Sequence, residues 1–306
     1  MSHADHLTVE SLWISVALSL IAIMYLHRWM RVAWLVPDGV EGWRAWSFVV
    51  GLLLAGIALS SPLSVLDHDL LTIHMVQHLL LMTLAPPLIL LGAPLKLLPQ
   101  GPVQRIVKLI ARPLRWSPLR RLGRMLSHPT FGWIGATAVL VLWHIPSIFM
   151  LGLRSQTWHG VEQVSFLVAG LLFWWPVVEP SRNASKWPKS SILLYLFLAT
   201  LPCDILSGFL VFCDRVVYPV YFSSQQFGLT PLEDQQCAGA LMWTCVTVVY
   251  FVAGAVFTAH LLSPRSAHKS EEFAIPQFDS RCIAVRHTDP QKTDLQRMDP
   301  HRMEAL

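Results

Sequence analysis

Long apolar stretches alternate with short polar ones along most of the chain. A membrane core about 30 Å thick needs roughly 20 residues of helix to cross it, and the apolar stretches have that length and are rich in Leu, Ile, Val and Ala. They show no alternation with a period of two, so they predict helices and not the strands of a membrane barrel. We expect seven membrane-spanning helices, at about 11–34, 46–66, 71–98, 129–151, 158–179, 190–213 and 237–262.

The composition supports this class of protein. Apolar residues make up 54% of the chain and charged residues 14%, and there are 13 Trp, which is typical of a polytopic membrane protein and not of a soluble domain. The pattern predicts an all-α helical bundle over residues 11–262, preceded by a short periplasmic tail over residues 1–10. The segment 263–306 is rich in charge, His and Pro, and we expect a mostly disordered cytoplasmic tail.

The positions of the basic residues predict the orientation. Cytoplasmic loops of membrane proteins carry an excess of Lys and Arg, and 21 of the 23 Lys and Arg fall on the side that holds the carboxyl terminus. The other side has only Arg154 and Arg215. The amino terminus is therefore expected outside and the carboxyl terminus in the cytoplasm. Between about 102 and 125, apolar residues recur at helical spacing among basic ones, which predicts a helix lying on the cytoplasmic lipid surface.

Histidines lie near the outer ends of several predicted spans. His74 and His78 are four residues apart, so on a helix both imidazoles point to the same side, and Asp67 extends that face. His144 lies in the fourth span and His159 at the start of the fifth. Ionisable groups inside a membrane are costly and usually face a partner or a cavity. Four histidines at one depth therefore predict a shared metal ion or cofactor.

Two further side chains at this depth are Asp204 in the sixth span and Met242 in the seventh. Imidazole and thioether ligands favour a soft to borderline ion, of which copper as Cu(I) fits best, with zinc as an alternative. A haem is a second possibility; it would pair His74 or His78 with His144 or His159, because two histidines four apart on one helix cannot bind opposite faces of one iron. A structural cluster without a ligand is the third. The predicted metal site comprises His74, His78, His144, His159, Asp67, Asp204 and Met242.

Prolines and aromatic residues predict local features around this site. Pro86 and Pro87 remove two amide donors, so the third span is expected to kink and to free carbonyl groups near 81–83. Pro146 is expected to open the backbone next to His144. The outer loop 214–236 carries aromatic residues, including Tyr218, which suggest a lid pressed on the membrane surface. The five cysteines form no CxxC motif, so no disulfide framework is expected.

Several short motifs follow one another along the predicted helices. They are His74-Met-Val-Gln-His78, Ala85-Pro-Pro, Leu91-Gly-Ala-Pro94, Trp143-His-Ile-Pro146, Phe173-Trp-Trp-Pro176, and Asp234-Gln-Gln with Gly239-Ala-Leu-Met-Trp243. In this order the motifs resemble the polytopic CtaG family of cytochrome c oxidase assembly factors, over roughly residues 45–262.

The resemblance implies a multi-pass protein of the bacterial inner membrane that is not an enzyme. It would serve the maturation of a haem-copper oxidase by binding or delivering copper at the periplasmic side. The expected partners are oxidase subunits, membrane lipid and other copper chaperones, and not nucleic acid. A haem-binding membrane redox protein and an assembly scaffold without a cofactor are the alternatives. One departure is Gln163, which stands where a second histidine is expected four residues after His159.

Overall fold

The computed structural model describes residues 3–35, 41–60, 66–94, 128–178 and 191–263. The predicted basic helix at 102–125 and the segment 264–306 of the expected tail lie outside the described residues. The chain divides into two compact units, residues 1–258 and 259–306, and the following description concerns the first unit.

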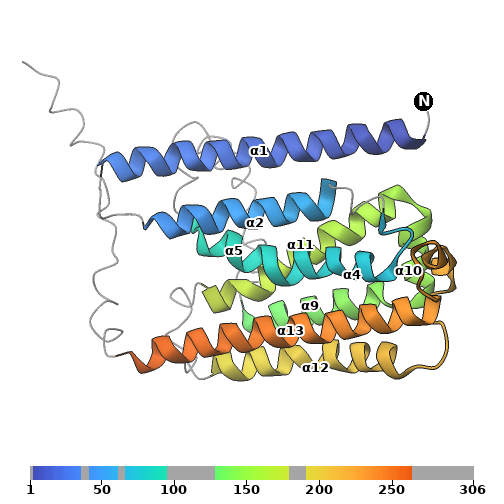
Figure 1. Ribbon diagram of the computed structural model, residues 1–306. Coiled ribbons are helices and arrows are strands. Elements are labelled where there is room, and N and C mark those ends of the chain that lie inside the picture. Colours follow the sequence, from blue (N-terminus) through green and yellow to red (C-terminus); the bar gives the residue numbers. More distant parts are fainter. Residues whose placement is uncertain (1–2, 36–40, 61–65, 95–127, 179–190, 264–306) are drawn as a thin grey trace, which may run out of the picture. The chain divides into compact units, whose positions relative to one another are not determined.

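All regular structure within the described residues is helical, and most of the long helices run side by side (Figure 1). The elements are α1 (His3–Leu35), α2 (Gly42–Ser60), α4 (Leu71–Leu79), the π-helical turn η1 (Leu80–Leu84), α5 (Ala85–Leu91), α9 (Pro129–Trp143), α10 (Pro146–Arg154), α11 (Gln156–Val178), α12 (Ser191–Phe212), the 3-10 segment η3 (Pro219–Phe227) and α13 (Pro231–Leu262).

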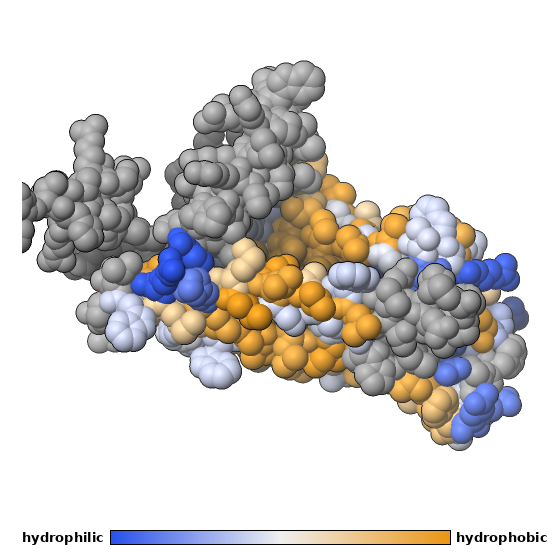
Figure 2. Space-filling model, turned by 90° about the horizontal axis from the view of Figure 1, so that it is seen from above, coloured by the Kyte–Doolittle hydropathy of each residue, from blue (hydrophilic) through white to orange (hydrophobic). Residues whose placement is uncertain are grey.

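Six described helices are long and apolar enough to cross a membrane, and α9 with α10 make a seventh span if the bent pair counts as one. Apolar residues occupy the middle of the face shown in Figure 2, with hydrophilic residues toward its ends. The all-α fold and the membrane-spanning helices are thus confirmed, while the side of the membrane that each terminus occupies stays a prediction. The apolar part of α1 is Leu12–Trp34, but the helix already begins at His3, within the expected tail.

The fourth predicted span is broken where the sequence predicted an opened backbone. The axes of α9 and α10 differ by 77°. His144 caps the end of α9, Ile145 is extended, and Pro146, which lacks an amide donor, begins α10. The Tyr218 hydroxyl donates to the carbonyl of His144 at 2.7 Å. A side chain from a distant loop therefore satisfies a carbonyl group at the break.

The third predicted span remains one span, Leu71–Leu91, in spite of its two prolines. The turn η1 accommodates the missing donors by π-helical pairing. The carbonyl of Met82, four residues before Pro86, accepts a hydrogen bond from Trp174 Nε1 at 3.2 Å. A Cβ atom on Gly170 would lie 2.6 Å from the same carbonyl, so α11 approaches the π turn this closely only because residue 170 is glycine. The carbonyl that was predicted to lack a main-chain donor is that of Met82, and the side chain of Trp174 donates to it.

The helix α11 lies at the centre of the bundle and contacts α5, α9, α10 and η1. Its side chains Phe166, Phe173 and Trp174 are almost completely buried in the main hydrophobic core. A smaller core joins α1 to α2, where the rings of Tyr25 and Phe48 stack with centroids 3.9 Å apart. The hydroxyl of Tyr25 donates to the carbonyl of Gly92 at 2.7 Å. This bond connects α1 to the end of α5.

The loop before α13 packs on protein. Tyr218 and Tyr221 are 2% and 1% exposed, and their ring centroids lie 4.3 and 6.1 Å from that of Phe149 in α10. The main-chain amide of Val217 donates to Gln235 Oε1 at 2.7 Å, which ties the loop to α13. The aromatic loop therefore packs over the bent fourth span, and its position on the membrane surface stays a prediction.

Candidate metal centre

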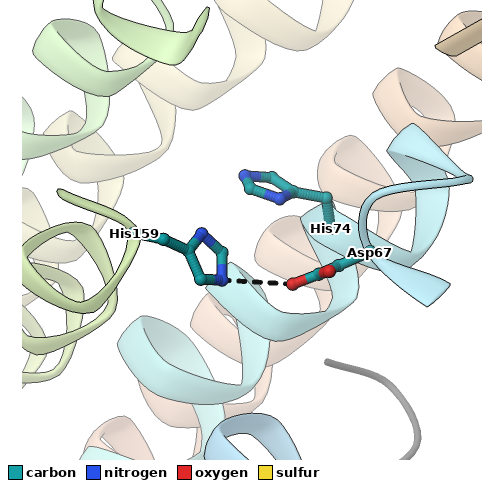
Figure 3. A group of neighbouring side chains, drawn as sticks. All are labelled: Asp67, His74 and His159. Carbon is teal, nitrogen blue, oxygen red and sulfur yellow. Dashed lines mark ion pairs between the residues drawn. The ribbon is translucent and has the colours of Figure 1, made fainter. Parts of the chain in front are cut away.

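Five ionisable side chains from two parts of the chain meet near the start of α4. Each has a relative exposure of 5% or less. The α4 side contributes three of them, and the first turns of α11 contribute two. We name this set the polar centre; it consists of Asp67, His74, His78, His159 and Glu162, and Figure 3 shows three of these side chains pointing toward one another.

Two overlapping groups within the polar centre have the spacing of metal ligands. In each group, one ligand atom per residue lies within 4.8 Å of the others. The first group is Asp67, His74 and His159, and the second is His74, His78 and Glu162. Because His74 belongs to both groups, they are continuous. The shortest contact joins His159 Nε2 to Asp67 Oδ2 at 3.1 Å, the dashed line in Figure 3.

The carboxylate of Glu162 contacts three imidazoles. Its Oε1 atom lies 3.5 Å from His74 Nε2 and 3.3 Å from His78 Nε2, and its Oε2 atom lies 3.4 Å from His159 Nδ1. The sequence did not lead to a prediction of Glu162 as a ligand. Its position three residues after His159 was the signal, since side chains at this spacing share a helix face.

Small and aromatic residues shape the space around the polar centre. Gly152 of α10 leaves room for the acid, because a Cβ atom there would lie 2.7 Å from Glu162 Oε2. The ring of His78 stacks on Phe166 with centroids 4.0 Å apart. Burial, and then the negative charges of nearby carboxylates, raise the pKa of the Tyr221 hydroxyl well above its ordinary value. The aromatic loop therefore presents a neutral hydroxyl group to this region.

Apart from the ion-pair contacts given above, several buried polar atoms of the polar centre form no hydrogen bond within the described part of the chain. They include both ring nitrogens of His74 and of His78 and both carboxylate oxygens of Asp67 and of Glu162. Buried polar groups normally have such partners, because leaving them unpaired costs free energy. The donor set of imidazoles and carboxylates matches the ligands of borderline divalent ions. These residues therefore fit a metal ion.

Three of the predicted ligands lie apart from the polar centre. The Nδ1 atom of His144 lies 2.7 Å from the carbonyl of Leu140, and its Nε2 atom lies 3.4 Å from the sulfur of Met75. Met242 is 3% exposed and lines a cavity that His144 also lines. Asp204 is partly buried and belongs to neither group of possible ligands.

Two other polar residues near the polar centre have contacts of their own. Asp234 accepts hydrogen bonds from the main-chain amides of Leu71 and Thr72 at 2.7 and 3.1 Å, so it caps α4 from the start of α13. Gln163, which replaces the expected histidine, has its side-chain nitrogen 2.9 Å from His159 Nε2. Asp234 therefore holds the start of α4, and Gln163 holds the ring of His159.

The cysteines of the described residues are free. They are Cys203, Cys213, Cys237 and Cys245. The expectation that they form no disulfide framework is confirmed for these four, and Cys282 lies outside the described residues.

Comparison with known proteins supports the family resemblance of the sequence motifs. Two uncharacterized proteins, one from Mycobacterium bovis and one from Mycobacterium tuberculosis, are each 24% identical to this chain over 184 residues. The matched region covers 56% of this chain but only 27% of each relative. No solved structure matches the chain. The model of the cytochrome c oxidase caa3 assembly factor family matches residues 23–264. The chain is thus a multi-pass membrane protein that belongs to the cytochrome c oxidase caa3 assembly factor family.

Proposed function

We propose that this assembly factor binds a copper ion in the polar centre and delivers it to the oxidase whose assembly it serves. The observation that carries the proposal is the burial of three imidazoles and two carboxylates at ligand spacing. A membrane protein that only needed to be stable would be expected to place apolar side chains there, because buried ionisable groups are expensive. The family supplies the context, since a haem-copper oxidase needs copper during maturation.

The ligand atoms of the polar centre favour the divalent state of the ion. They are nitrogen and oxygen atoms, and the two carboxylates of Asp67 and Glu162 balance the two charges of Cu(II). The prediction of Cu(I) from the sequence depended on the thioether of Met242, which lies apart from these five residues. Zn(II) would suit the same ligands, so the identity of the ion has to be measured.

The proposed side of the membrane is the periplasmic one. In Figure 1 the start of α1, the start of α4 and the start of α11 lie at the same end of the bundle. The distribution of Lys and Arg predicts that this end faces outward. Ligands at this end would be within reach of copper chaperones and of oxidase subunits that project from the membrane.

The spacing of the polar centre favours a metal ion over haem, because in each group one ligand atom per residue lies within 4.8 Å of the others, which suits bonds to a single ion. A scaffold role without a metal remains the competing proposal. An optical spectrum of the purified protein would show a reducible Soret band if haem were bound.

The test is metal analysis of the detergent-solubilised protein, with electron paramagnetic resonance of its Cu(II) form. We expect about one copper per chain and splitting of the signal by imidazole nitrogens. The variants His74→Ala and His78→Ala should lose the ion and should fail to support copper insertion into the oxidase, although they still insert in the membrane. The matched control is His27→Ala, an exposed histidine of α1. Normal copper content of the oxidase in both variant strains would refute the proposal.

A further inference from the structure

A cavity next to the polar centre differs from it in chemistry. It lies between α4, η1, α9, α11, α12 and α13 and has a volume of about 40 Å³. This exceeds the roughly 10–15 Å³ that one water molecule needs, so a dehydrated ion fits. We name it the sulfur-lined cavity. The side chains in its wall that can bind a metal ion are Met75, Met82, Met242, Cys203, His78 and His144.

The sulfur-lined cavity offers soft ligands without a carboxylate. Three methionines, one cysteine and two histidines line it, and none of the described residues that line it is Asp or Glu. Thioether and thiolate sulfur atoms select soft ions such as Cu(I). A doubly charged ion would be poorly compensated in such an apolar wall, because the cost of burying charge rises steeply with its amount. The chemistry therefore favours a monovalent soft ion.

The orientation of His144 is that of a metal ligand. Its Nδ1 atom lies 2.7 Å from the main-chain carbonyl of Leu140. A carbonyl oxygen only accepts, so Nδ1 carries the proton and Nε2 carries a lone pair. Histidines that bind metals commonly donate their other ring N–H to such a carbonyl. The Nε2 atom lies 3.4 Å from the sulfur of Met75, so a nitrogen and a sulfur atom that could bind one ion already adjoin.

His78 connects the sulfur-lined cavity to the polar centre. Its Nε2 atom lies 3.3 Å from Glu162 Oε1 in the polar centre, and its ring also borders the cavity. The ring centroids of His78 and His144 are 6.1 Å apart. One imidazole thus separates a region of oxygen and nitrogen ligands from a region of sulfur and nitrogen ligands.

We propose that the sulfur-lined cavity is a second metal site, selective for a soft monovalent ion, with His144 Nε2 and the sulfur of Met75 as its first ligands. Cys203 and Met242, on α12 and α13, would complete the ligand set. The inference rests on the proposed function for its purpose, because a protein that delivers copper to an oxidase would have a use for a site for Cu(I). The binding of the ion itself depends only on the cavity.

The probe for this site is Ag(I), a soft monovalent ion that needs no reductant. Titrations use the full-length protein in detergent, in a background in which Cys213, Cys237, Cys245 and Cys282 are replaced by Ala and Cys203 is kept. We expect about one Ag(I) per chain and a silver X-ray absorption spectrum with sulfur scattering. The double variant Met75→Leu/Met242→Leu should bind Ag(I) at least tenfold more weakly, and it should fold, because exchanges of Met for Leu conserve volume.

The controls separate this site from the polar centre. Met24→Leu changes an exposed methionine of α1 and should leave Ag(I) binding unchanged. Glu162→Gln should weaken Cu(II) binding and leave Ag(I) binding within threefold of the parent protein. If the parent protein binds Cu(II) but no Ag(I), or if the double methionine variant binds Ag(I) normally, the second site is refuted. Binding of Ag(I) without Cu(II) would instead overturn the proposed role of the polar centre.

Discussion

Replacing Glu162 with Gln tests the polar centre most directly, because this carboxylate contacts three imidazoles at 3.3–3.5 Å. The substitution keeps the size and shape of the side chain and removes its charge. An ion held by the same ligand atoms would lie within about 4 Å of the carboxylate. At that distance the attraction between one negative charge and a doubly charged ion is on the order of 8 kcal/mol at an effective dielectric constant of about 20.

Most of that attraction is offset, because free copper is hydrated and because an amide oxygen can still coordinate weakly. Replacement of groups that merely orient metal ligands costs about 10–100-fold in affinity, so loss of a charged ligand should cost at least the upper end of that range. We expect a decrease of about 100-fold or more in Cu(II) affinity, which corresponds to about 2.7 kcal/mol.

The assay is competition between the purified protein and a chromogenic chelator of known affinity, with thermal unfolding in detergent as a check on folding. Glu41→Gln is the matched control, since the Glu41 side chain is 58% exposed and should leave the affinity unchanged. Glu162→Asp, which keeps the charge, should recover part of the binding. Cu(II) affinity of folded Glu162→Gln within threefold of the parent protein would refute the assignment of this carboxylate.

Three smaller changes test how neighbouring residues position the site. Gly152→Ala should weaken Cu(II) binding about tenfold with little change in the melting temperature, because its Cβ atom would displace only the flexible end of Glu162; unchanged binding would contradict this. Asp234→Asn should lower the free energy of unfolding by roughly 1.5–3 kcal/mol, because two amides of α4 lose a charged acceptor; reversible unfolding in detergent measures it, and a change below 0.5 kcal/mol would argue against the cap. Tyr218→Phe should cost roughly 1–3 kcal/mol by leaving the carbonyl of His144 without this donor; a Tyr218→Phe protein as stable as the parent would count against it.

Features that depend on the periodicity of one helix could be predicted from the sequence. His74 and His78 share a face because they are four residues apart, and both enter the polar centre. Pro86 and Pro146 lack the amide donor of a regular helix, and the helix geometry changes next to each of them, at the π turn η1 and at the start of α10. The same reasoning could have included Glu162, which lies one turn after His159.

Features that depend on contacts between helices could not be predicted in the same way. His144 and His159 are both near the outer ends of predicted spans, yet only His159 belongs to the polar centre. His144 lies at the 77° break between α9 and α10, where its ring contacts Met75. Asp234 has a carboxylate of the kind that can bind a metal ion, but this carboxylate accepts a hydrogen bond from a main-chain amide of α4 and so caps that helix. Two side chains at the same depth in the membrane can therefore lie on different sides of the bundle.

The sequence by itself determined the all-α class and the approximate positions of the long apolar helices, because hydrophobicity and helical spacing act within one segment. The tertiary structure decided which of these residues became neighbours. The helices pack as they do because of the close approach at Gly170, the π turn at η1 and the bend before Pro146. This packing gathers imidazoles and carboxylates in the polar centre and sulfur-bearing residues around the neighbouring cavity.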